Sequence, residues 1–276
     1  MPPTPTQRTM VSQFVALTGA QDKVAQRFLK NAGFKLEVAV DQYYNSGQAG
    51  QASSKVDTAL DKMFDDIRDP SQDEKDVIGV DSMMAYLTSL GVNPESCEIF
   101  VVLEIVQAAG FGQITRKGYI NGWKATNVAA NPSAHKSYVR ECIARLSSDP
   151  SYFKKVYRHT FIAGKEPDQK ALSLENALVY WDLIFSPPGR PWATSKKNWL
   201  ADWKRFLEEK WKHSVNKDMW NQTLEFANKT MADESLSFWS EDAAWPSVID
   251  QFVLWLREAD KQPGGGGTVG ASMEVD

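Results

Sequence analysis

Residues 246–259 read PSVIDQFVLWLREA, and this stretch indicates the fold class of the whole chain. Its apolar residues recur every three or four positions, so a helix would place them on one face, toward a core. They are Val248, Ile249, Phe252, Val253 and Leu256. Pro246 favours a helix start. Asp250 falls on the opposite side of this helix, where we expect it to be exposed.

Helical periodicity of this kind continues through residues 57–260, and no long alternation of apolar and polar residues predicts a strand. Pro94 and Thr115 are placed to open two of the helices. One helix is expected to open at 93–95, and the others are predicted over 57–67, 79–91, 114–127, 133–146, 150–162, 173–185, 196–211, 217–232 and 246–259. The sequence therefore predicts an all-α fold with one large helical domain over residues 57–260.

A smaller unit precedes this domain, because residues 7–46 contain three short apolar helix faces in succession. Gly19 and Gly33 lie at the joins, and Gly33 suits a helix C-terminus. Residues 47–56, rich in Gly, Ser, Gln and Ala, are expected to form a linker. The Gly-rich tail, residues 261–276, is expected to be disordered.

The composition excludes several classes of protein. The chain has 276 residues, 42% of them hydrophobic, a formal net charge of -4, two cysteines and three histidines. Cys97 and Cys142 lie in apolar helical contexts, so we expect a reducing compartment and no disulfide framework or zinc site. The longest apolar stretch, 99–106, is too short to cross a bilayer, and neither a signal segment nor a basic excess is present. We expect a cytoplasmic or nuclear protein that binds neither membranes nor nucleic acid.

No catalytic constellation is evident among the residues. The three histidines, His135, His159 and His213, lie in polar or basic surroundings without a nucleophile motif, which is typical of surface or capping residues. No glycine-rich phosphate loop occurs before the tail. We therefore expect no catalytic residue and no cofactor.

The acidic loop that begins at Asp69 matches an EF-hand calcium loop only in part. Such a loop needs glycine at its sixth position and glutamate at its twelfth, which here are Glu74 and Val80. We expect an EF-hand-like helix pair without a metal, and a calcium sensor stays open as an alternative.

Charge is segregated in the last third of the chain, where residues 190–217 are mainly basic and residues 218–260 mainly acidic. This asymmetry indicates either a docking surface or solvated helix faces, and both interpretations stay open. Asp218 follows Asn216, a predicted N-cap, and its charge would favour the first turn of a helix. Asp218 and Asp250 are candidate surface acids for a basic partner.

The segment FKLEVAVDQYY, residues 34–44, resembles the third helix of ubiquitin-associated (UBA) domains. In that family, apolar residues in the loop between the first two helices contact ubiquitin. Here the loop keeps a glycine but has no aromatic residue. The resemblance implies a UBA-like domain over residues 7–46, with Leu17, Gly19, Tyr43 and Tyr44 as candidate ubiquitin-binding residues. Packing of the two tyrosines within the bundle is the alternative.

Several motifs resemble the defective-in-cullin-neddylation (DCN-like) family. They are Asp-Pro-x-x-Asp-Glu at 69–74, Ile-Gly-Val-Asp at 78–81, Tyr-Trp-Asp-Leu at 180–183, Asn-Lys-Asp-Met-Trp at 216–220 and Glu-Asp-Ala-Ala-Trp-Pro-Ser-Val-Ile-Asp at 241–250. The resemblance spans residues 7 to about 260. It implies that residues 57–260 form a potentiating-neddylation (PONY) domain, all-helical with EF-hand-like pairs that bind no calcium.

The resemblance also implies a function and two sites. The protein would be a scaffold-type ligase component that promotes transfer of a ubiquitin-like modifier from the neddylation conjugating enzyme to a cullin lysine. Asp218, Ala244 and Asp250 would contact the C-terminal winged-helix region of the cullin. An apolar pocket would take the acetylated N-terminus of the conjugating enzyme. By position, the pocket residues are Val80, Met83, Tyr86, Ile99, Val102, Val106, Ala108, Ile114, Tyr180 and Leu183.

In this mechanism the thioester cysteine and the attacking lysine belong to the partners, and the chain acts by positioning them. The alternative function is a non-catalytic adaptor. Its UBA-like domain would recruit ubiquitylated proteins, and its helical domain would only bind a cullin.

Overall fold

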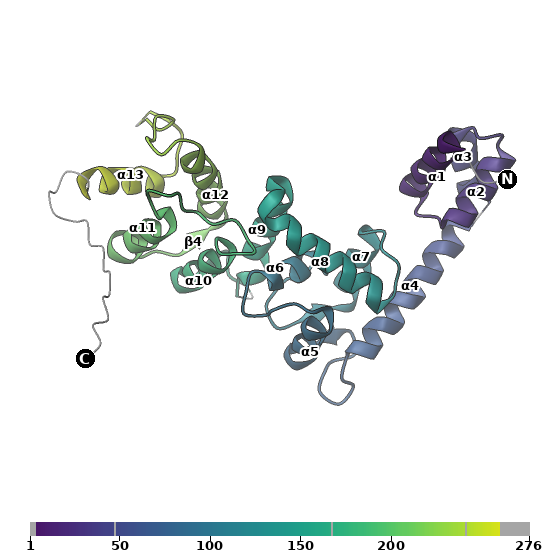
Figure 1. Ribbon diagram of the computed structural model, residues 1–276. Helices are drawn as coiled ribbons and strands as arrows, with labels where there is room; N and C mark the ends of the chain where they lie inside the picture. Colours follow the sequence, from purple (N-terminus) through teal and green to yellow (C-terminus); the bar gives the residue numbers. More distant parts are fainter. Residues whose placement is uncertain (1–3, 47, 167, 241, 260–276) are drawn as a thin grey trace, which may run out of the picture. The chain divides into compact units, whose positions relative to one another are not determined.

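The computed structural model describes the backbone of residues 4–46, 48–166, 168–240 and 242–259. It also describes the side chains of these residues, except those of residues 48–54. Its helices and short strands (Figure 1) belong to two compact units. The first unit contains the residues up to 94 together with 101–142, and the second contains 95–100 together with 143 onward. The helical domain that we predicted over 57–260 is thus divided between two units.

The chain begins with three short helices, α1 (Pro5–Thr18), α2 (Asp22–Asn31) and α3 (Leu36–Asn45). Phe14, Phe28 and Tyr43 share their core, where the Tyr43 ring lies edge-on to both phenylalanine rings, with centroids 5.7 and 5.4 Å apart. Gly19 ends α1 with φ 66°, a left-handed conformation that glycine adopts without a steric clash. These helices lie where the sequence predicted a three-helix unit.

The rest of the first unit contains two helix–loop–helix segments joined by a short sheet. Its elements are α4 (Gln48–Ile67), β1 (Val77–Ile78), α5 (Val80–Leu90), α6 (Glu98–Ile105), β2 (Ile114–Thr115), α7 (Arg116–Ala125) and α8 (Pro132–Ser148), of which α6 and α8 contribute to both units. Ile78 of β1 pairs with Ile114 of β2 in the antiparallel register. Gly122 lets α7 approach α6, because a Cβ there would lie 1.8 Å from the Ile105 carbonyl oxygen.

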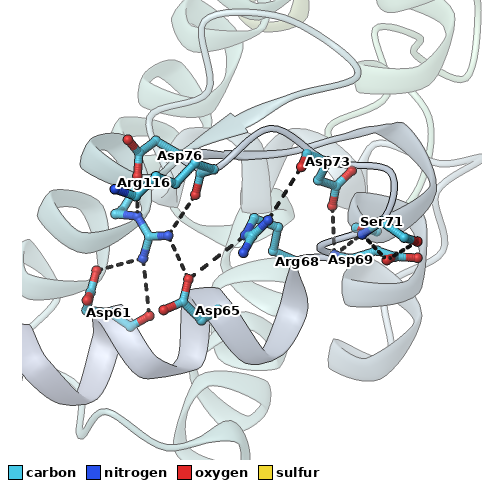
Figure 2. Close-up of polar contacts among 10 residues, drawn as sticks. Asp61, Asp65, Arg68, Asp69, Ser71, Asp73, Asp76 and Arg116 are labelled. Carbon is cyan, nitrogen blue, oxygen red and sulfur yellow. Dashed lines mark hydrogen bonds and ion pairs between the residues drawn. The ribbon is translucent and has the colours of Figure 1, made fainter.

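Arg116, at the start of α7, joins α4 to the loop before β1 (Figure 2). Its guanidinium lies 2.7, 2.6 and 2.7 Å from carboxylate oxygens of Asp61, Asp65 and Asp76. Its Cζ also lies 4.3 Å from the ring centroid of Phe64. The planar fork of an arginine can contact several carboxylates at once, so Arg116 fixes α4 against the helix pair.

The second unit repeats the helix–loop–helix arrangement. It contains α9 (Pro150–Gly164), β3 (Ala171–Leu172), α10 (Leu174–Ile184), α11 (Trp199–Phe206), the π-helical turn η1 (Leu207–Trp211), β4 (Val215–Asn216), α12 (Lys217–Ala232) and α13 (Ser247–Ala259). Leu172 of β3 pairs with Val215 of β4 in the antiparallel register. Buried tryptophans fill the core: Trp181, Trp192, Trp199, Trp203 and Trp220.

The all-α prediction is confirmed, because the strands in the described ranges are four segments of two residues each. Two boundaries were wrong. Residues 48–56, expected as a linker, are helical and belong to α4, since Ala and Gln favour helix. The helix expected to open at Pro94 begins at Glu98, whose N–H donates to the Ser96 hydroxyl at 3.3 Å. The tail, 261–276, lies outside the described residues.

His135 is buried, contrary to the prediction that it lies at the surface. It is 0% exposed, and its ring is stacked on Trp123 with centroids 3.5 Å apart. Neither ring nitrogen has a hydrogen-bond partner in the described part of the chain. Burial lowers the pKa of His135 to about 4, so the imidazole is neutral at pH 7. His213 is exposed, as predicted.

No helix in the described ranges is both long and apolar enough to span a lipid bilayer.

Candidate functional site

The structure places Asp218, Ala244 and Asp250 in the second unit. Asp218 lies exposed in the first turn of α12, directly after β4. Asn216 caps this helix, as predicted, by accepting a hydrogen bond of 2.8 Å from the N–H of Met219. A carboxylate here interacts favourably with the positive end of the helix dipole and still faces solvent.

Trp220 fixes the helix turn that presents Asp218. Its ring is stacked between Trp181 and Tyr157, with centroids 5.1 and 4.6 Å away. Its Nε1–H donates to the Tyr157 carbonyl at 2.9 Å, and the Tyr157 hydroxyl donates to the Trp220 carbonyl at 2.8 Å. Buried aromatic packing with satisfied polar groups makes this start of α12 rigid.

Asp250 lies in the first turn of α13 and is half-buried, whereas we expected it to be exposed. The reason is Trp239, in the loop before α13, whose Nε1–H donates to Asp250 Oδ1 at 2.9 Å. The wheel argument considered α13 alone and could not include a side chain arriving from the loop. The carboxylate is thus held in one orientation by a neutral donor.

Ala244 is exposed in the same loop, residues 233–246. The neighbouring Trp245 packs edge-on against Phe226 of α12, with centroids 5.7 Å apart. At the start of the loop, hydrogen bonds from Ser235 and Ser237 to the Asp233 carboxylate lower the pKa of Asp233 to about 2. These contacts fix residues near both ends of the loop, and the exposed Ala244 side chain is small.

The three residues come from two neighbouring helices and the loop that precedes the second of them. Ala244 and Asp250 belong to one loop–helix segment, and Asp218 belongs to α12. Phe226 of α12 and Phe252 of α13 pack edge-on, with centroids 5.9 Å apart. The neighbouring helices α12 and α13 therefore each have an acidic residue in the first turn.

The basic segment, 190–217, is partly neutralised inside the unit. Arg205 contacts Asp202 at 3.0 Å, and Lys204 forms an ion pair with Asp182 of α10. Lys210 and Lys217 are exposed. Part of the charge segregation therefore reflects ion pairs between helices, and the rest is available to solvent.

The apolar residues assigned to the conjugating enzyme by resemblance are divided between the two units. In the first unit, Val80 is 58% exposed, and six others are buried: Met83, Tyr86, Val102, Val106, Ala108 and Ile114. The Tyr86 hydroxyl accepts a hydrogen bond of 3.1 Å from the Trp123 indole. In the second unit, Ile99 is buried, whereas Tyr180 and Leu183 are half-buried.

The three-helix bundle answers the question left open for its two tyrosines. Tyr43 is 1% exposed and belongs to the core, so packing is its role. Tyr44 is 51% exposed, and its hydroxyl donates to the carbonyl of Leu17 at 3.0 Å. Leu17 itself is 58% exposed, and Gly19 is exposed beside it. Leu17, Gly19 and Tyr44 are thus the surface members of the predicted set.

The acidic loop after α4 is folded around its own carboxylates (Figure 2). Hydrogen bonds from the Ser71 hydroxyl and N–H, at 2.6 and 2.8 Å, lower the pKa of Asp69. Asp73 accepts from the N–H groups of Asp69 and Gly79 at 2.9 and 3.0 Å. Among the residues that the structure describes, no cluster of three or more acidic, His or Cys side chains is placed to hold a metal ion.

The two cysteines are buried and free. Burial raises the pKa of the Cys97 thiol to about 11, so this thiol is protonated at neutral pH. A protonated, buried thiol is a poor nucleophile. Covalent transfer by Cys97 is therefore disfavoured.

Trp239 is a residue of this site that the sequence interpretation missed. A signal for it exists: the loop 233–246 is rich in acidic residues and serines, yet it contains Phe238, Trp239 and Trp245. Large aromatic side chains in a polar loop predict contact with a neighbouring element. The sequence did not identify which polar group the indole would meet.

Comparisons with known proteins identify the family to which the chain is similar. Residues 134–255 match a family described as "Cullin binding", and residues 8–50 match a UBA-like domain. Over 286 residues and the full length of both chains, the sequence is 48% identical to "Defective in cullin neddylation protein 1" of Pyricularia oryzae. It is 31% identical to the protein of that name in Mycosarcoma maydis, with coverage of 90% of this chain and 94% of the relative. For the Yarrowia lipolytica protein the identity is 30%, and the coverage is 90% and 96%.

Proposed function

This chain belongs to the defective-in-cullin-neddylation family, and from that premise we propose that it is a scaffold-type component of a neddylation ligase. It binds a cullin and supports transfer of the ubiquitin-like modifier to the cullin. One observation carries this function: the cullin-binding match, 134–255, contains both ordered helix starts that present Asp218 and Asp250.

The proposed mechanism is positioning. The conjugating enzyme supplies the thioester and the cullin supplies the attacking lysine, so this chain needs no nucleophile of its own. By binding both partners it would raise the effective concentration of lysine and thioester and restrict their orientation, which lowers the entropic part of the barrier.

The finer assignment for the cullin is that its C-terminal winged-helix region contacts Asp218, Ala244 and Asp250. Two carboxylates around a small side chain would suit a basic ridge on the partner. Binding of the purified chain to a cullin C-terminal fragment tests this by calorimetry. We expect the Asp218→Ala, Asp250→Arg double variant to bind at least about tenfold more weakly, because a charge is lost and another reversed.

Glu258→Arg, on the exposed last turn of α13, is the matched control for a charge reversal away from this site. It should bind with wild-type affinity. Equal affinities for the double variant and Glu258→Arg would refute the assignment.

We further propose that the acetylated N-terminus of the conjugating enzyme contacts the apolar residues named for it. Val80 offers a clean test, since it is 58% exposed and its substitution leaves the core intact. Val80→Asp should weaken binding of an acetylated N-terminal peptide by about tenfold. Val179 is also exposed but is outside this set, so Val179→Asp should leave the affinity for the peptide unchanged. If both variants bind the peptide as the wild type does, Val80 has no part in this contact.

Ubiquitin binding by the three-helix bundle is the third finer proposal. Leu17 and Tyr44 supply the exposed apolar surface for it. In a titration of isotope-labelled ubiquitin, the wild-type chain should shift ubiquitin resonances and Leu17→Asp should abolish the shifts. Unshifted resonances with the wild type would remove ubiquitin from the partners. Location in the cytoplasm, the nucleus or both stays a prediction.

A further inference from the structure

The Trp239 indole lies across one face of α13. Asp250 and Arg257 are seven residues apart, which places them on the same side of the helix, two turns from each other. The indole N–H of Trp239 meets Asp250 Oδ1 at 2.9 Å, and its ring centroid lies 4.6 Å from the Arg257 guanidinium carbon. Trp239 is 6% exposed, so its ring is held between these contacts and the core.

This indole orients the Asp250 carboxylate without neutralising it. An arginine or lysine in the same place would cancel the negative charge, whereas a neutral N–H leaves it available to a cationic partner. Arg257 contacts the ring face of Trp239 instead. The indole therefore orients the Asp250 carboxylate without forming an ion pair with it.

The indole N–H groups of the buried tryptophans in this unit differ in their partners. Those of Trp192 and Trp220 donate to a neutral hydroxyl and a carbonyl, whereas those of Trp199 and Trp203 have no hydrogen-bond partner among the described residues. The indole N–H of Trp239 donates to a carboxylate. The one that meets Asp250 comes from the loop that also carries Ala244.

We propose that Trp239 is a positioning residue for cullin binding: its N–H holds the Asp250 carboxylate in the orientation that a basic group of the cullin meets. Fixing a carboxylate before binding removes part of the side-chain entropy lost on association. The inference rests on the proposed function and adds to it a residue that need not touch the cullin.

The test is Trp239→Phe, which keeps an aromatic ring under Arg257 and removes only the N–H donor. Cullin binding should weaken about fivefold, the size of effect expected when one more side chain must be ordered on binding. Trp255→Phe is the matched control. Trp255 lies on α13, as Asp250 does, and its ring also contacts an arginine, with Arg205 Cζ 4.7 Å from the ring centroid. This control should bind the cullin with wild-type affinity.

A double-mutant cycle separates positioning from a structural role. In an Asp250→Ala background, Trp239→Phe should have no further effect on affinity, because the carboxylate it orients is gone. Thermal unfolding of each variant shows whether the fold is retained. A fivefold loss in both backgrounds, or an affinity that rises when the donor is removed, would overturn the inference.

Failure of the inference and failure of the proposed function give different results. If Asp218→Ala, Asp250→Arg binds the cullin normally, the proposed site itself is wrong. If that double variant fails to bind while Trp239→Phe behaves as Trp255→Phe does, the site stands and only the positioning role is refuted.

Discussion

Residue scale: burial of His135 makes the folded protein less stable as the pH falls. Its pKa is lowered from 6.5 to about 4 in the folded protein, so between these values the unfolded chain binds a proton more readily. The contribution of the neutral His135 ring to the free energy of unfolding is fully present above pH 6.5 and is lost as the pH falls toward 4. A shift of this size corresponds to a loss on the order of 3 kcal/mol.

The corresponding prediction concerns His135→Phe. Phenylalanine keeps the stacking on Trp123 and cannot be protonated, so the free energy of unfolding should fall less between pH 7 and pH ~4.5, by about 2 kcal/mol. Urea unfolding at both pH values measures this difference. His213→Phe, at an exposed position, should keep the wild-type pH dependence. An unchanged dependence in His135→Phe would show that burial of His135 does not control acid sensitivity.

A second residue-scale prediction concerns Gly164, at the end of α9. A Cβ there would lie 2.3 Å from Cε2 of Tyr180, so the ring of Tyr180 must move if alanine replaces the glycine. Gly164→Ala should leave the protein folded and weaken binding of the acetylated conjugating-enzyme peptide by roughly threefold or more.

Gly110→Ala is the control, since a Cβ at Gly110 meets nothing within 4 Å. Peptide titrations of Gly164→Ala and Gly110→Ala measure the two affinities, and circular dichroism checks that both variants are folded. Peptide affinity unaffected by Gly164→Ala would argue against a role for Tyr180.

Element scale: Arg116 joins α4 to the loop before β1 through several carboxylates. Arg116 contacts Asp61 and Asp65 on α4 as well as Asp76, and its side chain is only 18% exposed. Contacts of this kind exceed an ordinary surface ion pair, because one planar group bridges several carboxylates. Arg116→Lys retains the charge and loses the fork, so it should lower the free energy of unfolding by about 1–2 kcal/mol.

Lys124→Ala supplies the comparison for Arg116→Lys. Lys124 pairs with Asp57 of the same helix α4, and its side chain is 34% exposed. We expect a cost below about 1 kcal/mol for this pair in chemical denaturation. A smaller effect of Arg116→Lys than of Lys124→Ala would refute the account of α4.

Helices could be predicted from the sequence wherever periodicity and caps agreed. Thr115 caps α7 and Asn216 caps α12, both as predicted, and Pro150 opens α9. The start of α6 could not be predicted, because Ser96 competes as a cap with the favourable helix start at Pro94. At residues 48–56, the Gly and Ser content predicted a linker, but these residues are helical and belong to α4.

The sequence predicted only some features of the candidate site. Asp218 is exposed, as the sequence predicted, because the first turn of a helix exposes side chains of this kind, whereas Ala244 was named by the resemblance alone. The half-burial of Asp250 and the burial of His135 depend on aromatic rings that come from other segments, Trp239 and Trp123. Contacts between segments distant in sequence leave no periodic signal in either segment.

Whole-molecule scale: the chain has one all-helical architecture in two units, and its proposed chemistry belongs to its partners. The described structure offers ordered acidic helix starts in the second unit and a buried Cys97 thiol whose pKa is raised to about 11. An adaptor and a ligase component share these features. They differ in whether the protein changes the rate of transfer once both partners are bound.

That rate is the most direct measurement. With conjugating enzyme already charged with the modifier, the single-turnover transfer to a cullin C-terminal fragment is followed with and without this protein. The account predicts an acceleration of at least about tenfold with the wild type, as a positioning effect of only 1.4 kcal/mol would give, and none with Asp218→Ala, Asp250→Arg. Equal rates with and without the wild-type protein, under conditions where it is bound to the cullin, would contradict the ligase function and leave the adaptor.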